Sequence, residues 1–167
     1  MKPLSVDIPY PNLDDLTVDV RSGQIISFAY ATPSGELTAI LQYRYHKLHF
    51  ADFDESDADT LESISVSEMQ HLELLGKAML KLGVNPLYTT CPNTTKWYSA
   101  DCVSRSKLPY SMLADDIMSE MNAISDYKKM LFVLKNEKVE ELIGRIILDE
   151  ELHLSTLKEM IQRYAKV

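Results

Sequence analysis

Glu36-Leu-Thr-Ala-Ile-Leu-Gln-Tyr43 and Glu120-Met-Asn-Ala-Ile-Ser-Asp-Tyr127 both read E-x-x-A-I-x-x-Y, and their first residues lie 84 positions apart. Glu68-Met-Gln-His71 and Glu150-Glu-Leu-His153 both read E-x-x-H and lie 82 positions apart. The chain therefore has two related halves, each with two carboxylates and one imidazole. Four Glu and two His at these spacings are a ligand set that two metal ions take inside a four-helix bundle.

These six residues fall on helix faces that are otherwise apolar. Positions three, four and seven apart share one face of an α-helix, so each E-x-x-H motif presents its two polar groups together. Burying four carboxylates without partners would cost several kcal/mol per ion, a cost that two divalent cations remove. We therefore predict a metal centre whose ligands are Glu36, Glu68, His71, Glu120, Glu150 and His153.

Each motif alone has a simpler interpretation. A single E-x-x-H on a helix is usually a solvated surface pair, and a lone Glu on an amphipathic helix usually lies at the edge of the apolar stripe. What favours the metal centre is the joint order, in which Glu precedes E-x-x-H in each half of the chain.

Three further residues are candidates for contacts around the ligands. Tyr43 and Tyr127 either hydrogen-bond a ligand carboxylate or pack in the core. Asp149 either accepts a hydrogen bond from a ligating histidine, which fixes its tautomer, or is a solvated acid. The position that matches Asp149 in the first half is Ser67, so this support is expected on one side only.

The periodicity predicts an all-α fold. We expect helices at about 18–49, 58–82, 109–135 and 137–165, after an extended N-terminal arm at 1–17, with a crossover at 84–108. Short, long and short connections describe a ferritin-like four-helix bundle with one long crossover between helices two and three. Residues 1–167 are then a single domain.

Local signals refine the predicted helices. Pro33 either kinks the first helix or restarts it with Thr32 as the cap. Gly83 stands where a C-terminal residue in the left-handed region belongs. On a regular helix, His46 and His49 point about 80° and 140° away from Glu36, so we expect both at the surface or edge.

Composition limits the partners. The chain has 167 residues, a net charge of −8 and no basic run, which argues against nucleic acid. No apolar run approaches the roughly 20 residues that span a membrane, and the N-terminus lacks a signal-peptide core, so we expect a cytoplasmic location. Cys91 and Cys102 form no C-x-x-C pair and are expected to be free thiols.

The motifs resemble those of the ferritin-like di-metal carboxylate superfamily, over about residues 18–165. Within it, the segments 36–43 and 68–76 are most similar to rubrerythrin-like and manganese-catalase-like proteins. The resemblance implies that Glu36 and His71 are terminal ligands of one metal, that Glu120 and His153 are terminal ligands of the other, and that Glu68 and Glu150 bridge the pair.

Departures from these families narrow the function. Rubrerythrin has a further glutamate where this chain has Ala123, and a rubredoxin domain that is missing from this sequence. Bacterioferritin binds haem through a methionine at the position of Met69, but methionine is a common core filler, so we expect no haem. Manganese catalase has a comparable ligand set and needs no external electron donor.

The resemblance implies two iron or manganese ions and an oxidoreductase that acts on hydrogen peroxide or dioxygen, by catalase-, peroxidase- or ferroxidase-like chemistry. Some of these reactions require an external electron donor. The alternative is a non-catalytic metal-binding, iron-storage or assembly protein. In either case we expect a homo-oligomer, and for a simple enzyme a dimer.

Overall fold

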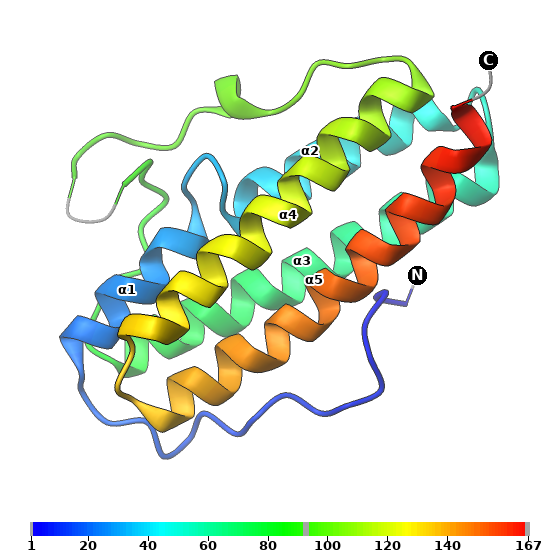
Figure 1. Ribbon diagram of the computed structural model, residues 1–167. Helices are drawn as coiled ribbons and strands as arrows, with labels where there is room; N and C mark the ends of the chain where they lie inside the picture. Colours follow the sequence, from blue (N-terminus) through cyan, green and yellow to red (C-terminus); the bar gives the residue numbers. More distant parts are fainter. Residues whose placement is uncertain (1, 92–93, 166–167) are drawn as a thin grey trace.

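The computed structural model describes residues 2–91 and 94–165, and it places five α-helices and one short 3-10 helix in them (Figure 1). The elements are α1 (Val20–Tyr30), α2 (Glu36–Phe50), α3 (Glu55–Lys81), η1 (Ala100–Cys102), α4 (Pro109–Val133) and α5 (Glu137–Tyr164). Within the described ranges there is no β-strand, only an isolated bridge between Thr89 and Trp97. The predicted all-α bundle is confirmed.

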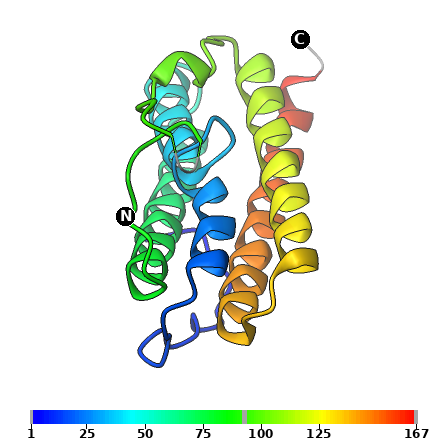
Figure 2. The same cartoon turned by 90° about the vertical axis from the view of Figure 1, so that its left-hand side faces the viewer.

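The bundle consists of two helical hairpins that lie side by side (Figures 1 and 2). In one hairpin α2 packs on α3, and in the other α4 packs on α5, while α1 continues the α2 position along α3 and α4. The segment between α3 and α4 runs the length of the bundle, as the predicted crossover requires. Both cysteines lie in this segment as exposed free thiols.

The predicted first helix is two helices. The chain turns at residues 31–35, where the hydroxyl of Thr32 donates to the carbonyl of Phe28 at 2.7 Å. The helix restarts after Pro33, which is one of the two predicted alternatives, but the residue that caps the new helix is Gly35 and not Thr32. Gly35 is the N-cap of α2, and a Cβ there would lie 2.6 Å from the carbonyl oxygen of Ala29. This close approach requires glycine, and it makes Glu36 the first residue of α2.

Other helix ends follow from capping chemistry. The side chains of Asp19, Asp54 and Asn136 accept hydrogen bonds from backbone N–H groups in the first turns of α1, α3 and α5. Because Asp54 is the cap, α3 begins three residues before the predicted position 58. Gly83 has a φ of 86° just after α3, as predicted. Pro109 is itself the first residue of α4, where its missing N–H leaves no intrahelical hydrogen bond unmade.

Two apolar clusters occupy the two ends of the bundle. The first apolar cluster contains Ile26, Tyr30, Leu75, Met79, Tyr127, Met130, Leu142 and Ile146. The second apolar cluster contains Tyr43, Phe50, Leu61, Ile64, Met112, Leu113, Leu157 and Met160. A fully buried side chain of this size contributes about 1.5–3 kcal/mol, so these clusters stabilise the bundle and leave the layer between them for polar groups.

The N-terminal segment before α1 is extended and lies against α5 (dark blue in Figure 1). Leu13 is buried in the first apolar cluster, and Leu4 packs on the second. The segment therefore passes the polar layer between its two anchors. Residue 1 of the predicted arm and residues 92–93 of the predicted crossover lie outside the described residues, and the single-domain assignment stays a prediction.

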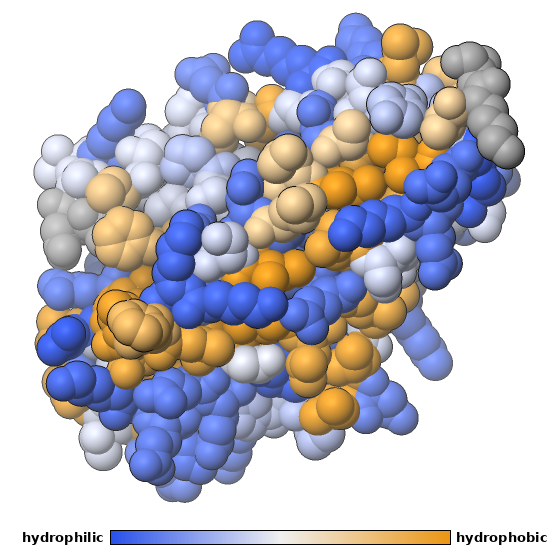
Figure 3. Space-filling view, viewed as in Figure 1, coloured by the Kyte–Doolittle hydropathy of each residue, from blue (hydrophilic) through white to orange (hydrophobic). Residues whose placement is uncertain are grey.

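Apolar side chains also form a band on the surface that α4 and α5 share (Figure 3). Met121, Ile124, Phe132 and Leu154 lie together on this surface, and the exposed fraction of Phe132 is 91 %. In the part of the chain described here, none of the helices is long and apolar enough to cross a membrane.

Candidate metal centre

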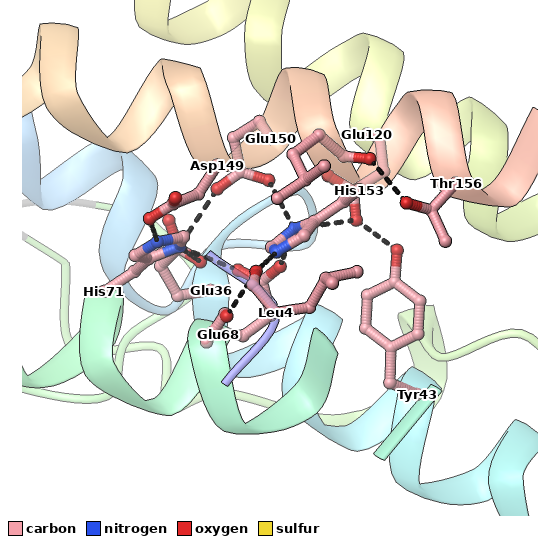
Figure 4. A network of polar contacts seen from close by, with 12 residues as sticks. Leu4, Glu36, Tyr43, Glu68, His71, Glu120, Asp149, Glu150, His153 and Thr156 are labelled. Carbon is pink, nitrogen blue, oxygen red and sulfur yellow. Dashed lines mark hydrogen bonds and ion pairs between the residues drawn. The ribbon is translucent and has the colours of Figure 1, made fainter. Parts of the chain in front are cut away.

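The six predicted ligands come from four helices and meet in the layer between the apolar clusters (Figure 4). They lie on α2 (Glu36), α3 (Glu68, His71), α4 (Glu120) and α5 (Glu150, His153), and every one is buried. The local reason is helical periodicity, which puts the glutamate and histidine of each E-x-x-H motif on one inward face.

The six residues form two overlapping groups of possible ligands. One group is Glu36, Glu68, His71 and Glu150, and the other is Glu68, Glu120, Glu150 and His153. Within each group, one oxygen or nitrogen atom of every residue lies within 4.8 Å of the others. Glu68 and Glu150 belong to both groups, which matches the bridging positions that the resemblance implies.

Each histidine turns its Nδ1 atom toward the carboxylates. The Nδ1 of His71 lies 3.0 Å from Glu150 Oε1, 3.1 Å from Glu68 Oε2 and 3.7 Å from Glu36 Oε2. The Nδ1 of His153 lies 2.9 Å from Glu68 Oε1, 3.6 Å from Glu150 Oε2 and 3.9 Å from Glu120 Oε1. Both imidazoles thus present one nitrogen to the centre of the cluster and the other to its outside.

Three donor atoms of the cluster fit a metal ion better than a hydrogen-bond network. Glu68 Oε1, Glu150 Oε1 and His153 Nδ1 are buried and make no aligned hydrogen bond among the described residues, although each lies 2.9–3.0 Å from an ion-pair partner within the cluster. Unpaired buried polar atoms are rare and call for an explanation such as a bound ion. Oxygen-rich sets with imidazole suit iron and manganese rather than metals that prefer thiolates. The residues present therefore fit two such ions.

The charges of the cluster are unequal without metal. Burial raises the pKa of Glu36 and Glu120 well above the usual range, and neighbouring carboxylates add to this effect. Burial also acts on Glu150, together with the charge of Glu68, but contacts with Glu120 and both histidines outweigh them and lower its pKa to about 2. The pKa of Glu68 is lowered as well, because contacts with His153 and His71 outweigh burial.

The histidines respond in the opposite sense. Burial lowers the pKa of His153, but Glu150 and Glu68 raise it to about 10. The pKa of His71 is raised well above its usual range by Asp149 and Glu150, against the effect of burial. These shifts favour the protonated form of both histidines and the ionised form of Glu68 and Glu150, so metal binding must displace protons.

The two tyrosines connect the halves of the chain crosswise. The hydroxyl of Tyr43 donates to Glu120, and the hydroxyl of Tyr127 donates to Glu36. Each tyrosine thus holds the carboxylate that belongs to the other half's motif. Both side chains also pack in the apolar clusters, so the two sequence interpretations are combined.

Outside the cluster, the histidines meet different partners. His71 Nε2 lies 3.1 Å from Asp149 Oδ2, which is the contact expected of Asp149. His153 Nε2 lies 2.8 Å from the backbone carbonyl oxygen of Leu4, which also accepts from the hydroxyl of Ser67. The sequence gives no sign of the Leu4 contact, because a backbone carbonyl in an extended arm has no residue signature.

A small cavity leads to the cluster from the surface. Its floor is formed by Glu36, Glu68, Glu120 and Glu150, and its sides come from residues 28–39 and 119–130. The cavity volume is about 20 Å³, which is room for about one water molecule. Ser34 and Gly35 of the turn at 31–35 line this cavity. Ala123, which stands where rubrerythrin has a glutamate, lines one side.

His46 corrects one expectation. It is fully buried rather than at the surface, and its Nδ1 lies 2.8 Å from Asp116 Oδ1. Gln42 donates to the same oxygen at 2.8 Å, and Ser104 Oγ lies 3.2 Å from His46 Nε2. His46 points away from Glu36 on the helix, and it belongs to neither group of possible metal ligands. The angle from Glu36 missed Asp116, one turn before Glu120 on α4, as the polar partner that allows burial. His49 is half-buried.

Comparison with known proteins gives structural matches only. No protein-family model matches this sequence, and no curated protein matches it. The structure is similar to that of KatB, a manganese catalase from Anabaena, with a TM-score of 0.85 and 18 % identity over 96 % of this chain and 80 % of that chain.

Two bacterioferritin-type structures also match. Bacterioferritin BfrA of Mycobacterium tuberculosis has a TM-score of 0.72 at 20 % identity, over 90 % of this chain and 89 % of that chain. The dodecameric thioferritin of Bacteroides fragilis, a bacterioferritin-related protein, has a TM-score of 0.70 at 21 % identity, over 90 % of each chain. The resemblance that the motifs indicated is thereby confirmed for the architecture, and this chain has the ferritin-like fold.

Proposed function

We propose that this protein binds two ions of manganese or iron and is an oxidoreductase that acts on hydrogen peroxide or dioxygen. The observation that carries the proposal is the pair of overlapping, fully buried donor groups with unpaired atoms at their centre. Glu36 and His71 would bind one ion, and Glu120 and His153 would bind the other. Glu68 and Glu150, which belong to both donor groups, would bind both ions. Four carboxylates balance the charge of two divalent cations, which offsets the cost of burying them.

Two redox-active ions bound by these residues would supply a two-electron change, one electron each, which is what reduction of a peroxide O–O bond requires. The protein's own groups orient the ligands and exclude water. Tyr43 and Tyr127 fix the terminal carboxylates through their hydroxyls, and the apolar clusters close both ends of the site. The small size of the cavity that Ala123 lines favours a substrate no larger than hydrogen peroxide or dioxygen.

Disproportionation of hydrogen peroxide to water and dioxygen is the first candidate reaction. In it two peroxide molecules give two waters and one dioxygen, so the electrons balance without an external donor. The similarity to a manganese catalase over 96 % of this chain supports this choice. A peroxidase reaction would need a separate electron donor, so peroxide turnover should be assayed with and without an added donor.

Ferroxidase chemistry with iron storage is the second candidate, supported by the match to bacterioferritins over 90 % of this chain. The exposed apolar band on α4 and α5 supports association of several copies. A storage shell would elute as a large oligomer, whereas a catalase-like enzyme is expected as a smaller one, a dimer in the simplest case. Met69, which stands at the position through which bacterioferritin binds haem, is 43 % exposed. The absence of haem stays a prediction, as does the cytoplasmic location.

Activity of purified, metal-loaded protein tests the proposal. Manganese-loaded protein should release dioxygen from peroxide, and iron-loaded protein should be assayed for oxidation of ferrous iron and for donor-dependent peroxide turnover. Loss of the activity is expected in Glu68→Ala and in His153→Ala. Glu73→Ala, an exposed glutamate on the same helix as Glu68, is the matched control. Retained activity in both cluster variants would refute the proposal.

A further inference from the structure

The outer nitrogens of the two cluster histidines both lead to the N-terminal arm, defined here as residues 3–10. The arm has no helix or strand, and hydrogen bonds fasten it to α3 and α5. Several of them fall on groups that touch His71 or His153. The arm thus covers the outer side of the candidate metal centre.

On the His71 side the arm acts through Asp149. Asp149 Oδ2, which contacts His71, also accepts from the hydroxyl of Tyr10 at 2.6 Å. Its other oxygen, Oδ1, accepts from the backbone N–H of Val6 at 2.8 Å. The carboxylate is therefore held from both ends by the arm, and its orientation toward His71 depends on them.

Arg145 fastens the same part of the arm. Its guanidinium donates to the carbonyl of Ile8 at 2.7 Å and to the carbonyl of Val6 at 3.0 Å. It also lies 2.8 Å from Asp149 Oδ2 and over the ring of Tyr10. A buried arginine on the apolar stripe of α5 is thus used to bind backbone carbonyls of the arm and the acid that they surround.

On the His153 side the arm acts directly. The carbonyl oxygen of Leu4 lies 2.8 Å from His153 Nε2 and accepts from Ser67 at 2.8 Å. The N–H of Leu4 donates to the carbonyl of Ser63 at 3.1 Å, which fixes the direction of the peptide. The acceptor for His153 is therefore a neutral carbonyl, whereas the acceptor for His71 is a carboxylate.

Metal-ligating histidines donate their second N–H to such partners, which set the ring orientation, and a carboxylate partner raises the basicity of the imidazole. We propose that the N-terminal arm is part of the metal centre, that it positions both histidines, and that it makes the two metal positions unequal. The ion beside His71 binds more tightly than the ion beside His153. The inference rests on the proposed function, since it presupposes two bound ions.

The test is a stepwise titration of metal-free, full-length protein with Mn²⁺, in which calorimetry and electron paramagnetic resonance monitor the binding of each ion. The wild type should bind two ions in two distinguishable steps. Asp149→Asn should weaken the tighter step by about 10- to 100-fold and change the weaker step by much less. Tyr10→Phe, which keeps the ring beneath Arg145, should act on the same step with a smaller loss.

The contact between the arm and His153 is tested by Leu4→Gly. This change removes the side chain that packs on the second apolar cluster, and it should weaken the binding step of the ion beside His153. Asp7→Asn, an exposed residue of the same arm, is the matched control and should change neither step. A general loss of stability would weaken both steps together, so the step that changes separates positioning from folding. Melting temperatures of the metal-free variants check this directly.

Two results overturn the inference in different ways. If the wild type binds two ions but Asp149→Asn and Tyr10→Phe leave both steps unchanged, or weaken them equally, the arm does not distinguish the positions. If the wild type binds no Mn²⁺ or Fe²⁺ at all, the proposed function fails and the inference fails with it.

Discussion

The protein buries two clusters of histidine and carboxylate side chains, and they differ in how completely their polar atoms are paired. In the first, His46 and Asp116 are fully buried, and each finds its partners in the other, in Gln42 and in Ser104. In the second, four glutamates surround two histidines, and three atoms have no hydrogen-bond partner among the described residues.

This contrast separates a buried polar pair with a structural role from a candidate binding site. One histidine facing one aspartate is a closed pair that contributes to structure, because its buried polar atoms find hydrogen-bond partners in each other, in Gln42 and in Ser104. Four carboxylates facing two imidazoles leave an excess of acceptors that only additional cations or protons balance. The predictions below separate these two roles.

The largest effect is expected from the shared ligands. Glu68→Ala removes a donor from both groups, so the protein should lose both ions. Loss of a residue that only hydrogen-bonds a ligand lowers activity by up to about 100-fold, and loss of the ligand itself should lower peroxide turnover by more than that. Elemental analysis and an oxygen electrode measure the two losses. Two ions per chain in this variant would show that Glu68 is not a ligand.

His46→Ala should have the opposite profile. It leaves Asp116 buried with Gln42 as its remaining side-chain donor, so we expect a loss of about 1–3 kcal/mol in the free energy of unfolding, while two ions per chain are retained. Denaturant titration measures the stability. The double variant His46→Leu/Asp116→Leu should recover much of the loss. Loss of bound metal in well-folded His46→Ala would place this pair in the metal centre.

Ala123→Phe should separate access from binding. The larger side chain fills the cavity above the glutamates, so metal content should stay at two ions while turnover of peroxide falls toward that of metal-free protein. Overpacking should reduce stability by about 1–3 kcal/mol. Met121→Phe, at an exposed position of the same helix, is the control. Unchanged turnover would mean that the substrate uses another route.

The pH dependence should also distinguish the metal-free and metal-loaded forms. The folded-state pKa of His153 is raised to about 10, so its contribution to stability is complete below about pH 6.5 and is lost as the pH rises to about 10. The pKa of Glu150 is lowered to about 2, so its contribution is complete above about pH 4.5 and is lost as the pH falls to about 2.

Metal affinity should follow the reverse trend above neutral pH, because raising the pH removes the protons that compete with the ions. Melting curves between pH 5 and 10, with and without Mn²⁺, check both signs. A metal-free protein that becomes more stable as the pH rises from 6.5 to 10 would contradict the charge assignment of the cluster.

The sequence alone predicted what helical periodicity controls. Glu68 with His71, and Glu150 with His153, could be placed on one face because their spacing is local, and the doubled motif brought the two halves together. The arm contacts of Leu4 and Val6 were missed because they use backbone atoms across the whole chain. The His46–Asp116 pair was missed because burial of one polar residue depends on a partner 70 positions away.

Metal content shows whether the glutamate–histidine cluster is a site for two metal ions. Protein purified without added metal should be measured by elemental analysis together with native mass spectrometry. We expect about two ions of manganese or iron per chain, and a higher melting temperature than in the metal-free form. No bound metal, together with no rise in melting temperature on adding Mn²⁺ or Fe²⁺, would contradict the two-metal site.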